Sequence, residues 1–201
     1  MTAAYIALEG LEGCGKSTHT KRLGEHLGAV ITREPGGTRI GSLLRGILAD
    51  TESTDMSPRT EALLMAADRA QHMAEVVQPA LDAGRHVVSD RSIYSTLAYQ
   101  GHGRRLGVPD LLSISTWALA GRLPDLVVFI EVPTDVLNQR LAKRNLDRFE
   151  REGAEFFARV NDGFHELMAA DPDRWIVVDG TAPKDDVEAD IRTRVSAALS
   201  L

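Results

Sequence analysis

The chain has 201 residues, of which 43% are hydrophobic and 26% charged, and its formal net charge at pH 7 is -6. This composition is typical of a globular protein, and the length predicts a single domain over residues 1–201. The negative charge argues against nucleic-acid binding by bulk electrostatics, and no apolar stretch is long enough to span a bilayer. With a single cysteine and no signal-like N-terminus, we expect a cytoplasmic protein without nucleic-acid or membrane partners.

The first predicted elements are a strand over residues 5–9 and a helix over residues 16–27, joined by a glycine-rich loop. The loop reads Gly-Leu-Glu-Gly-Cys-Gly-Lys-Ser and fits the phosphate-binding pattern Gly-x-x-x-x-Gly-Lys-Ser/Thr in its strand–loop–helix context. Glycines let backbone N–H groups face a phosphate, and a helix N-terminus favours anions. We therefore predict an ATP-binding loop made of Gly10, Leu11, Glu12, Gly13, Cys14, Gly15, Lys16, Ser17 and Thr18.

Two side chains of this loop indicate its chemistry. Lys16 supplies a full positive charge for the outer phosphates, and the hydroxyl of Ser17 is a candidate ligand for Mg²⁺. The alternative is a glycine-rich turn with an incidental lysine, which the flanking strand and helix make the weaker interpretation. Thr18 stands where a dinucleotide-binding fingerprint needs its third glycine, so that motif is excluded.

A second strand is predicted over residues 29–33, and the turn signal Glu-Pro-Gly-Gly-Thr follows it. Ligands collect at the carboxyl ends of strands in open α/β sheets. Arg33 and Glu34 therefore lie where a substrate would bind, or else they form a solvated surface turn. A short helix over residues 40–49 carries Arg45.

A long helix is predicted over residues 59–83, because apolar residues recur there at helical spacing. Arg69 and His72 lie among small and apolar residues of this helix. For His72 we expect a packing role with satisfied hydrogen bonds. Arg69 is harder to explain by packing alone, because arginine is rarely buried without a partner.

A third strand is predicted over residues 86–90, and it ends in Asp90, which Arg91 follows. In phosphate-loop proteins an acid at this position can hold Mg²⁺ directly or through water. The next segment, residues 92–100, presents hydroxyl groups and one carboxamide, which suit recognition of a nucleotide base.

The rest of the chain alternates helices and strands. We predict a loop over 101–107, a helix over 110–120 capped by Asp110, a strand over 126–131, a helix capped by Thr134 that runs through 139–152, a helix over 153–170, a strand over 175–179 and a helix over 185–201. Five apolar strands that alternate with helices predict an α/β fold with a doubly wound, five-stranded parallel sheet.

Arg140, Arg144 and Arg148 are spaced four residues apart, so a continuous helix would place them near one face. One interpretation is a solvated helix in which these arginines pair with nearby acidic residues. The other is a short basic lid over about residues 141–152 that closes over ATP.

Three classes of phosphate-loop protein compete. A GTPase switch should carry Asn-Lys-x-Asp, and a transport or motor ATPase should carry further signature segments; the chain has none of these. A small-molecule kinase needs a donor site, an arginine-rich acceptor site and a basic lid, and the chain has candidates for all of them. The kinase interpretation is therefore favoured.

The sequence resembles the thymidylate kinases, of the bacterial type with an acidic residue in the phosphate loop and arginines in the lid. The resemblance covers nearly the whole chain and rests on six segments. They are the phosphate loop, Thr-Arg-Glu-Pro-Gly-Gly-Thr at 32–38, Thr-Glu-Ala-Leu-Leu-Met-Ala-Ala-Asp-Arg at 60–69, Asp-Arg at 90–91, Ser-Thr-Leu-Ala-Tyr-Gln-Gly at 95–101 and Asp-Arg-Phe-Glu at 147–150.

The resemblance implies a homodimer that phosphorylates dTMP to dTDP with ATP and Mg²⁺. It implies an acceptor site made of Glu12, Glu34, Arg45, Met65, Arg69, Arg91, Ser95, Thr96, Tyr99 and Gln100. The arginines would hold the dTMP phosphate, Thr96 and Gln100 would read the thymine edge, and Tyr99 would disfavour a 2′-hydroxyl. Glu12 would face the 3′-hydroxyl, and Asp90 would organise Mg²⁺. Another nucleoside-monophosphate kinase, or a silent nucleotide-binding scaffold, is the alternative.

The chain departs from the family pattern at Ser92, where an aromatic residue is usual, and at Met65, where a phenylalanine that stacks on thymine is expected. Among the variable positions of its loop there is no arginine, so a second cation must come from elsewhere. The resemblance and the spacing favour Arg148 as the contact to the transferred phosphate and Arg144 as its support. The predicted catalytic set is Lys16, Asp90, Arg144 and Arg148.

Overall fold

The computed structural model describes residues 3–142 and 147–200. Its centre is a parallel five-stranded sheet with the strand order β2-β3-β1-β4-β5. The strands are β1 (Tyr5–Glu9), β2 (Val30–Arg33), β3 (Val87–Asp90), β4 (Leu126–Glu131) and β5 (Trp175–Asp179). This is the doubly wound α/β sheet that the sequence predicted, and each predicted strand agrees with the observed one to within one residue.

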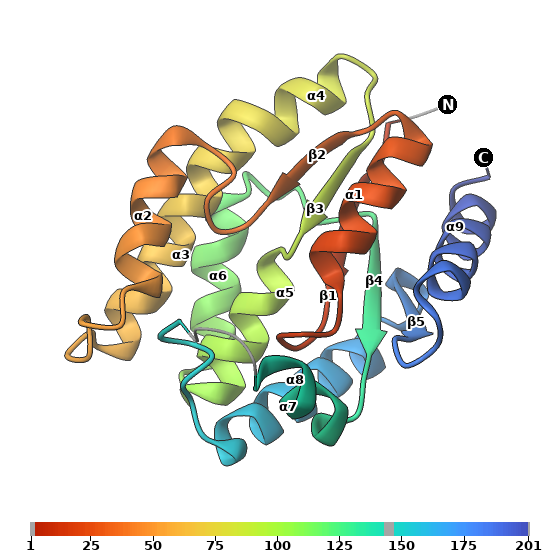
Figure 1. Cartoon of the computed structure of the whole chain (residues 1–201). Coiled ribbons are helices and arrows are strands. Elements are labelled where there is room, and N and C mark those ends of the chain that lie inside the picture. Colours follow the sequence, from red (N-terminus) through yellow and green to blue (C-terminus); the bar gives the residue numbers. More distant parts are fainter. Residues whose placement is uncertain (1–2, 143–146, 201) are drawn as a thin grey trace.

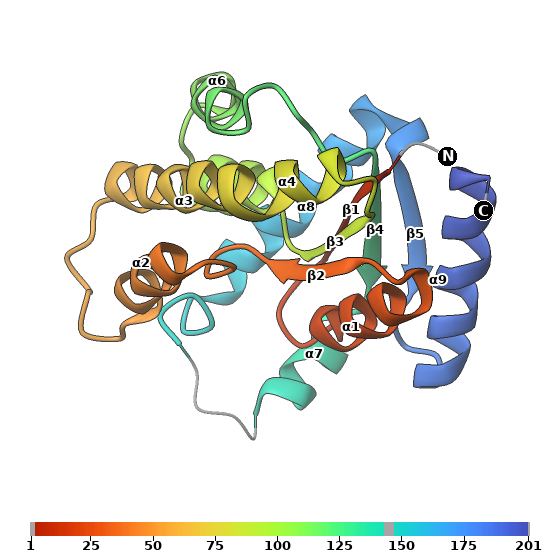
Figure 2. The same cartoon turned by 90° about the horizontal axis from the view of Figure 1, so that it is seen from above.

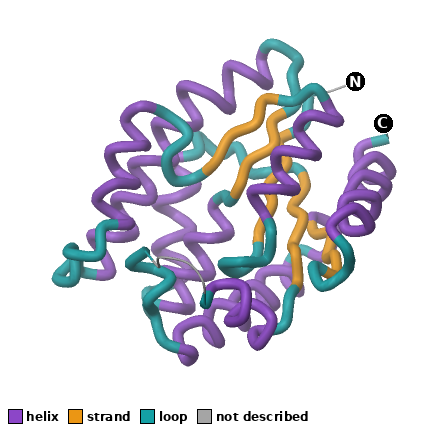
Figure 3. The backbone as a smooth tube through the Cα atoms, in the orientation of Figure 1, coloured by secondary structure: helices purple, strands orange, loops and turns teal. Residues whose placement is uncertain are grey.

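Helices cover both faces of the sheet (Figure 1). They are α1 (Lys16–Leu27), α2 (Arg39–Ala49), α3 (Pro58–His72), η1 (Met73–Val77), α4 (Gln78–Asp82), α5 (Ile93–Thr96), η2 (Leu97–Gly103), α6 (Val108–Ala118), α7 (Thr134–Leu141), α8 (Ala154–Ala170), η3 (Pro172–Arg174) and α9 (Lys184–Leu199). Figure 2 shows α1, α7 and α9 on one side of the sheet and α3, α4 and α8 on the other, with α6 outside α3. The tube in Figure 3 shows the strands enclosed between these layers.

The central strands are apolar because helices bury them from both faces. Every residue of β1 is fully buried. Every residue of β4 is buried except the last, Glu131, which is exposed. A strand covered on both faces must be a continuous apolar run, and that is the pattern the sequence shows at these positions.

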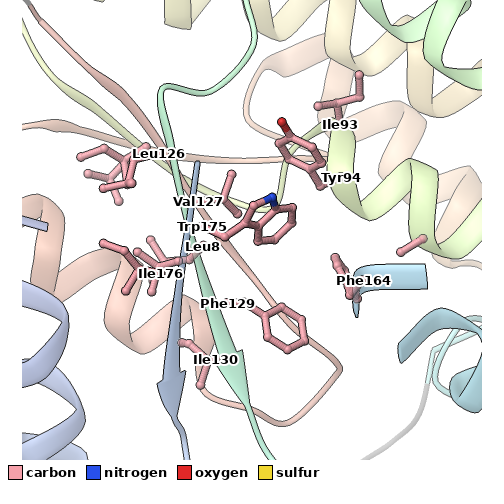
Figure 4. Packing of buried hydrophobic residues seen from close by; sticks show 14 of the residues in the cluster. Leu8, Ile93, Tyr94, Leu126, Val127, Phe129, Ile130, Phe164, Trp175 and Ile176 are labelled. Atoms are coloured by element: carbon pink, nitrogen blue, oxygen red, sulfur yellow. The ribbon is translucent and has the colours of Figure 1, made fainter. Parts of the chain in front are cut away.

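Aromatic side chains fill the core between the sheet and α8 (Figure 4). The ring of Phe129 on β4 lies 5.1 Å from that of Phe164 on α8, and Trp175 on β5 meets Tyr94 edge-on at 4.8 Å. Such tilted and edge-on pairs add to the stabilisation from burial alone. The first pair holds β4 against α8 and the second holds β5 against α5. Helix α8 also packs on η2, the segment that carries part of the site.

Several helix boundaries differ from the predictions. The helix predicted over 59–83 is interrupted by the π-helical segment η1, and residues 101–103, predicted as loop, belong to the π-helical η2. Asp110 does not cap α6. The helix begins at Val108, with Gly107 as its cap and Pro109 in the first turn, so Asp110 lies inside the first turn. Thr134 is the first residue of α7, and Pro133 precedes it as the cap.

The continuous helix predicted through residues 139–152 is wrong. Helix α7 ends at Leu141, and residues 148–151 form turns before α8 begins at Ala154. The carboxylate of Asp147 accepts hydrogen bonds from the backbone N–H groups of Phe149 and Glu150, at 2.9 and 3.0 Å. An aspartate that binds backbone donors in this way stabilises a turn in competition with a helix. The described arginines of this stretch therefore do not share one helix face.

Within residues 3–142 and 147–200, no helix combines the length and the apolar character needed to cross a bilayer.

Candidate active site

The site lies at the carboxyl ends of β1, β2 and β3, where the register places Leu8 and Arg33 beside Asp90. A cavity of about 340 Å³ opens there. Every residue predicted for the acceptor site lines it, together with Lys16, Ser17 and Asp90. The lining residues are Glu12, Gly13, Lys16, Ser17, Arg33, Glu34, Pro35, Arg45, Leu48, Ala49, Met65, Asp68, Arg69, Asp90, Arg91, Ser92, Ser95, Thr96, Tyr99, Gln100, Asp147, Phe149 and Glu150.

The loop between β1 and α1 has the backbone that the phosphate-binding pattern requires. Gly10, Gly13 and Gly15 have positive φ angles of 142°, 82° and 103°, which other residues rarely adopt. A Cβ atom on Gly10 would lie 2.8 Å from the carbonyl oxygen of Ile130 and 2.9 Å from the Sγ of Cys14. The loop can therefore run this close to β4 only with glycine at position 10.

Gly10, Leu11, Cys14, Gly15 and Thr18 of the predicted loop do not line the cavity. Leu11 and Cys14 are 5% and 3% exposed and belong to the core, so their side chains hold the loop to the sheet. Thr18 lies in the first turn of α1, where its backbone N–H donates to the carbonyl of Gly15. The burial of Cys14 favours a packing role for this thiol.

Lys16 folds back across the loop. Its Nζ donates hydrogen bonds to the carbonyl oxygens of Gly10 at 2.9 Å and Leu11 at 2.8 Å. Both partners are neutral, so these bonds leave the positive charge of Lys16 available to an anion in the cavity that it lines.

Ser17 and Asp90 present oxygen atoms together at the cavity wall. The Ser17 hydroxyl donates to Asp90 Oδ2 at 2.5 Å. A hydroxyl and a carboxylate are the hard donors that Mg²⁺ accepts, and this ion takes one or two protein ligands and otherwise phosphates and water. In the described part of the chain no group of three or more histidine, cysteine or acidic side chains forms a metal cage. The pair therefore fits Mg²⁺ carried by a nucleotide.

Glu12 of the loop turns towards Arg91 and Tyr99. Arg91 donates to Glu12 at 2.7 Å and to the hydroxyl of Ser95 at 2.9 Å, and the Tyr99 hydroxyl donates to the other Glu12 oxygen at 2.7 Å. The guanidinium of Arg91 lies 4.9 Å from the centre of the Tyr99 ring. These contacts join the phosphate loop to the segment that follows β3.

Arg69 and His72 share the carboxylate of Glu34, which is almost fully buried. Arg69 Nε donates to one oxygen at 2.9 Å, and His72 Nδ1 lies 2.8 Å from the other. Burial alone would raise the pKa of the Glu34 carboxyl, but Arg69 and His72 outweigh it and lower this pKa. The surface-turn alternative for Glu34 is therefore wrong. The packing role predicted for His72 is confirmed, since its Nε2 also lies 2.7 Å from the hydroxyl of Thr32.

Arg45 faces the cavity beside another cation. Its Nη1 donates to the carbonyl of Pro35 at 3.2 Å. Burial, and next the neighbouring charge of Arg33, lower the pKa of the Arg45 guanidinium. Two guanidinium groups that repel each other at a cavity wall are stabilised when an anion binds between them.

Thr96, Gln100 and Met65 form the remaining wall. Thr96 accepts a hydrogen bond from Arg69 Nη2 at 3.0 Å, and Gln100 Nε2 donates to Glu61 at 2.8 Å. Met65 lines the cavity from α3. A thioether is polarizable and can cover the face of a base.

Ser92, where the family usually has an aromatic residue, has a local structural role. It caps α5, and its hydroxyl and backbone N–H both donate to Glu9 at 2.8 Å. Glu9 also accepts from the backbone and hydroxyl of Ser95, and burial raises the pKa of the Glu9 carboxyl.

Sequence reasoning missed three buried acids: Asp68, which lines the cavity, and Glu9 and Glu61, which contact residues that line it. Asp68 accepts from the backbone N–H of Gly36 at 2.9 Å, and its pKa is raised by burial. An acidic residue next to an apolar run could have indicated such a buried acid, as with Glu9 at the end of the first strand. A buried acid of this kind must have partners, although the sequence does not identify them.

Arg148 does not line the cavity. Its Nε donates to the carbonyl of Leu48 at 2.8 Å, and its Nη2 lies 2.7 Å from Glu61. Arg140 instead contacts the phosphate loop, through the carbonyl of Gly13 at 3.3 Å. Arg144 lies outside the described residues, so its predicted role stays a prediction, as does that of Arg148.

A phosphate loop that shares one cavity with a set of inward-facing arginines and a buried amide, on a doubly wound parallel sheet, defines a phosphate-loop kinase of the nucleoside-monophosphate type. The thymidylate kinase family model matches residues 8–191. The chain therefore belongs to the thymidylate kinase family.

Curated relatives agree with this assignment. The chain is 42% identical over 207 residues to a thymidylate kinase of Clavibacter michiganensis subsp. michiganensis, which covers 100% of this chain and 98% of the relative. It is 42% identical over 205 residues to a thymidylate kinase of Desulforudis audaxviator, covering 99% and 93%. It is 43% identical over 202 residues to that of Leifsonia xyli subsp. xyli, covering 97% and 95%.

Proposed function

We propose that this protein transfers the terminal phosphoryl group of ATP to dTMP, with Mg²⁺, to form dTDP and ADP. The observation that carries the proposal is that Lys16 and Ser17 of the phosphate loop line the same cavity as Arg45, Arg91 and Gln100. A donor and an acceptor phosphate bound in one cavity of this size lie next to each other, so the phosphoryl group can pass directly from one to the other.

The chain's own contribution to the reaction is positioning and charge. The loop N–H groups and Lys16 hold the donor phosphates, and Arg45, Arg69 and Arg91 hold the acceptor phosphate. That phosphate is already anionic, so no strong base is needed to make it a nucleophile. When bound, Mg²⁺ supplies charge neutralisation between the phosphates, and Ser17 and Asp90 would hold it.

Other side chains of the same cavity recognise the sugar and the base. The carboxylate of Glu12 can accept a hydrogen bond from the 3′-hydroxyl, and Tyr99 fills the space that a 2′-hydroxyl would need. Thr96 and Gln100 read the thymine edge, and Met65 covers its face. Glu34 and Ser95 keep Arg69 and Arg91 in place, as their short hydrogen bonds support.

The second cation for the transferred phosphoryl group is assigned to Arg148, with Arg144 as its support. Arg148 reaches the phosphates only if it leaves Glu61, its ion-pair partner in this structure. The segment 141–152 acts as the lid that carries it.

We further propose that the protein acts as a homodimer in the cytoplasm. The neighbouring helices α3 and α6 carry exposed apolar side chains, among them Leu63 at 57%, Leu112 at 43% and Trp117 at 83% exposure. A patch of this kind marks an interaction surface. Sedimentation of the wild type and of a Trp117→Asp variant tests this: the wild type should sediment as a dimer and the variant as a monomer, and a monomeric wild type would refute it.

The function is tested by a coupled ADP-release assay with ATP, Mg²⁺ and a panel of nucleoside monophosphates. We expect dTMP to have the highest kcat/KM, with dTDP as the product. A higher kcat/KM for dGMP or AMP would mean that the protein is a different nucleoside-monophosphate kinase. If no nucleoside monophosphate of the panel is phosphorylated, the protein is a catalytically inactive nucleotide-binding protein.

A further inference from the structure

We propose that Glu61 is a positioning residue that sets the preference for thymine over cytosine by fixing which end of the Gln100 amide faces the cavity. This inference rests on the proposed function. Glu61 is 1% exposed, lies in the first turn of α3 and is absent from the cavity lining, so it acts through Gln100 and does not touch the substrate.

Glu61 is contacted by donors from three residues, Gln100 and Arg104 at η2 and Arg148. Its Oε1 accepts from Gln100 Nε2 at 2.8 Å and from Arg104 Nε at 3.2 Å. Its Oε2 accepts from Arg104 Nη2 at 3.1 Å and lies 2.7 Å from Arg148 Nη2. In the described part of the chain, all the polar groups that contact this carboxylate are N–H donors, so both of its oxygens act as hydrogen-bond acceptors.

This environment decides the orientation of the Gln100 amide. A side-chain amide has one carbonyl oxygen and one NH₂ group, and its orientation follows from its hydrogen-bond partners. Gln100 must point its NH₂ group at Glu61, because its carbonyl oxygen in that position would face a carboxylate oxygen and two acceptors would meet. The carbonyl oxygen of Gln100 is then turned towards the cavity that this residue lines.

A carbonyl oxygen selects a particular base edge. The N3 atom of thymine carries a hydrogen and donates, so it pairs with this oxygen. The N3 atom of cytosine has only a lone pair, so two acceptors would face each other in a buried site. A site built around such a hydrogen bond can reject the wrong partner by several orders of magnitude.

The substitution Glu61→Gln tests the proposal with little change of shape. Two guanidinium nitrogens lie at the Oε2 position and only one, at 3.2 Å, at the Oε1 position, so the new carbonyl oxygen is held at Oε2 and the new NH₂ faces Gln100. The Gln100 amide then turns, and its own NH₂ faces the cavity. We expect the ratio of kcat/KM for dTMP to that for dCMP to fall by about tenfold or more.

Two further variants separate positioning from general damage. Glu188→Gln makes the same change in a buried carboxylate of α9, which contacts Arg192 on the same helix and His19 on α1 and does not line the cavity, and this variant should leave the ratio unchanged. In a Gln100→Ala background, Glu61→Gln should have no further effect on the ratio, because the amide through which it acts is gone.

Melting curves establish that each variant is folded. Should Glu61→Gln not fold, Glu61→Asp keeps the charge for both arginines while it withdraws from Gln100, and the ratio should fall by about threefold or more. The role of Glu61 would be refuted by a ratio within about twofold of wild type in folded Glu61→Gln, or by an equal fall of the ratio when Glu61→Gln is made in the Gln100→Ala background. Either result would leave the proposed function standing. Preference of the wild type for dCMP over dTMP would overturn the proposed function as well.

Discussion

The hydroxyl of Ser17 donates to the carboxylate of Asp90 over 2.5 Å, which joins the first turn of α1 to the last residue of β3. Residues 73 positions apart in the chain therefore present their oxygens at one point of the cavity wall. The arrangement follows from the parallel sheet, in which β1 and β3 are neighbours and end at the same edge.

Replacement of Asp90 should weaken the use of Mg²⁺. In Asp90→Asn the carboxylate is lost while the shape is kept, so we expect kcat to fall and the Mg²⁺ concentration for half-maximal activity to rise by about tenfold or more. Titration of Mg²⁺ at saturating ATP and dTMP measures this. Asp179→Asn, at the end of β5 and outside the cavity, is the matched control. An unchanged Mg²⁺ requirement in Asp90→Asn would remove Asp90 from the metal site.

The carboxylate of Glu34 should make stability depend on pH. Its pKa is lowered in the folded protein, because Arg69 and His72 outweigh the effect of burial. As the pH falls below about 4.3, the usual value for glutamate, the unfolded chain therefore takes up a proton first and the stabilisation is lost.

Urea unfolding of Glu34→Gln and the wild type tests this. At pH 7 the variant should be less stable by about 3 to 5 kcal/mol, because Arg69 loses its buried partner. The difference in the free energy of unfolding should shrink as the pH falls through the range below about 4.3. A difference that stays constant with pH would show that the Glu34 charge contributes nothing.

Arg148 should matter to the transition state more than to binding. We expect Arg148→Ala to lower kcat by on the order of 10³ with a much smaller change in the KM for dTMP. Arg148→Lys should recover little, since a point charge does not replace the planar guanidinium. Arg122→Ala, which removes a surface arginine paired with Asp125, should leave kcat unchanged. Near-normal kcat in Arg148→Ala would show that the ion pair with Glu61 is the whole role of Arg148.

Met65 should limit how well the site distinguishes dTMP from dUMP. The two differ by one methyl group, which is worth about 1 to 3 kcal/mol in an apolar pocket. With the flexible Met65 in the wall, we expect the wild-type preference at the low end of this range, and Met65→Phe should increase it several-fold. Initial rates with both nucleotides give the ratio. A lower ratio in Met65→Phe would mean that Met65 does not cover the base.

Much of the fold could be predicted because it depends on local patterns. The buried strands are continuous apolar runs, and the phosphate loop has a fixed spacing of glycines before Lys16. The place of Arg33, Glu34 and Asp90 at one cavity could be expected as well, because parallel strands place their carboxyl ends at one edge. The place of Arg45 and Gln100 was implied by the resemblance to the thymidylate kinases.

The partners of buried acids could not be predicted. Glu61 binds Gln100, Arg104 and Arg148, which are distant in the chain, and no local pattern encodes such contacts. The spacing of Arg140 and Arg148 suggested a single helix, but the turn that Asp147 stabilises overrides it.

The central claim, that this cavity transfers a phosphoryl group from ATP to dTMP, is tested most directly at Lys16. We expect the wild type to convert dTMP to dTDP with ATP and Mg²⁺, and Lys16→Ala to lose several orders of magnitude in kcat while its melting temperature is kept. Lys21→Ala, an exposed lysine later on α1, should retain wild-type activity. A Lys16→Ala rate of dTDP formation within about tenfold of wild type, a difference of roughly 1.4 kcal/mol, would contradict the account.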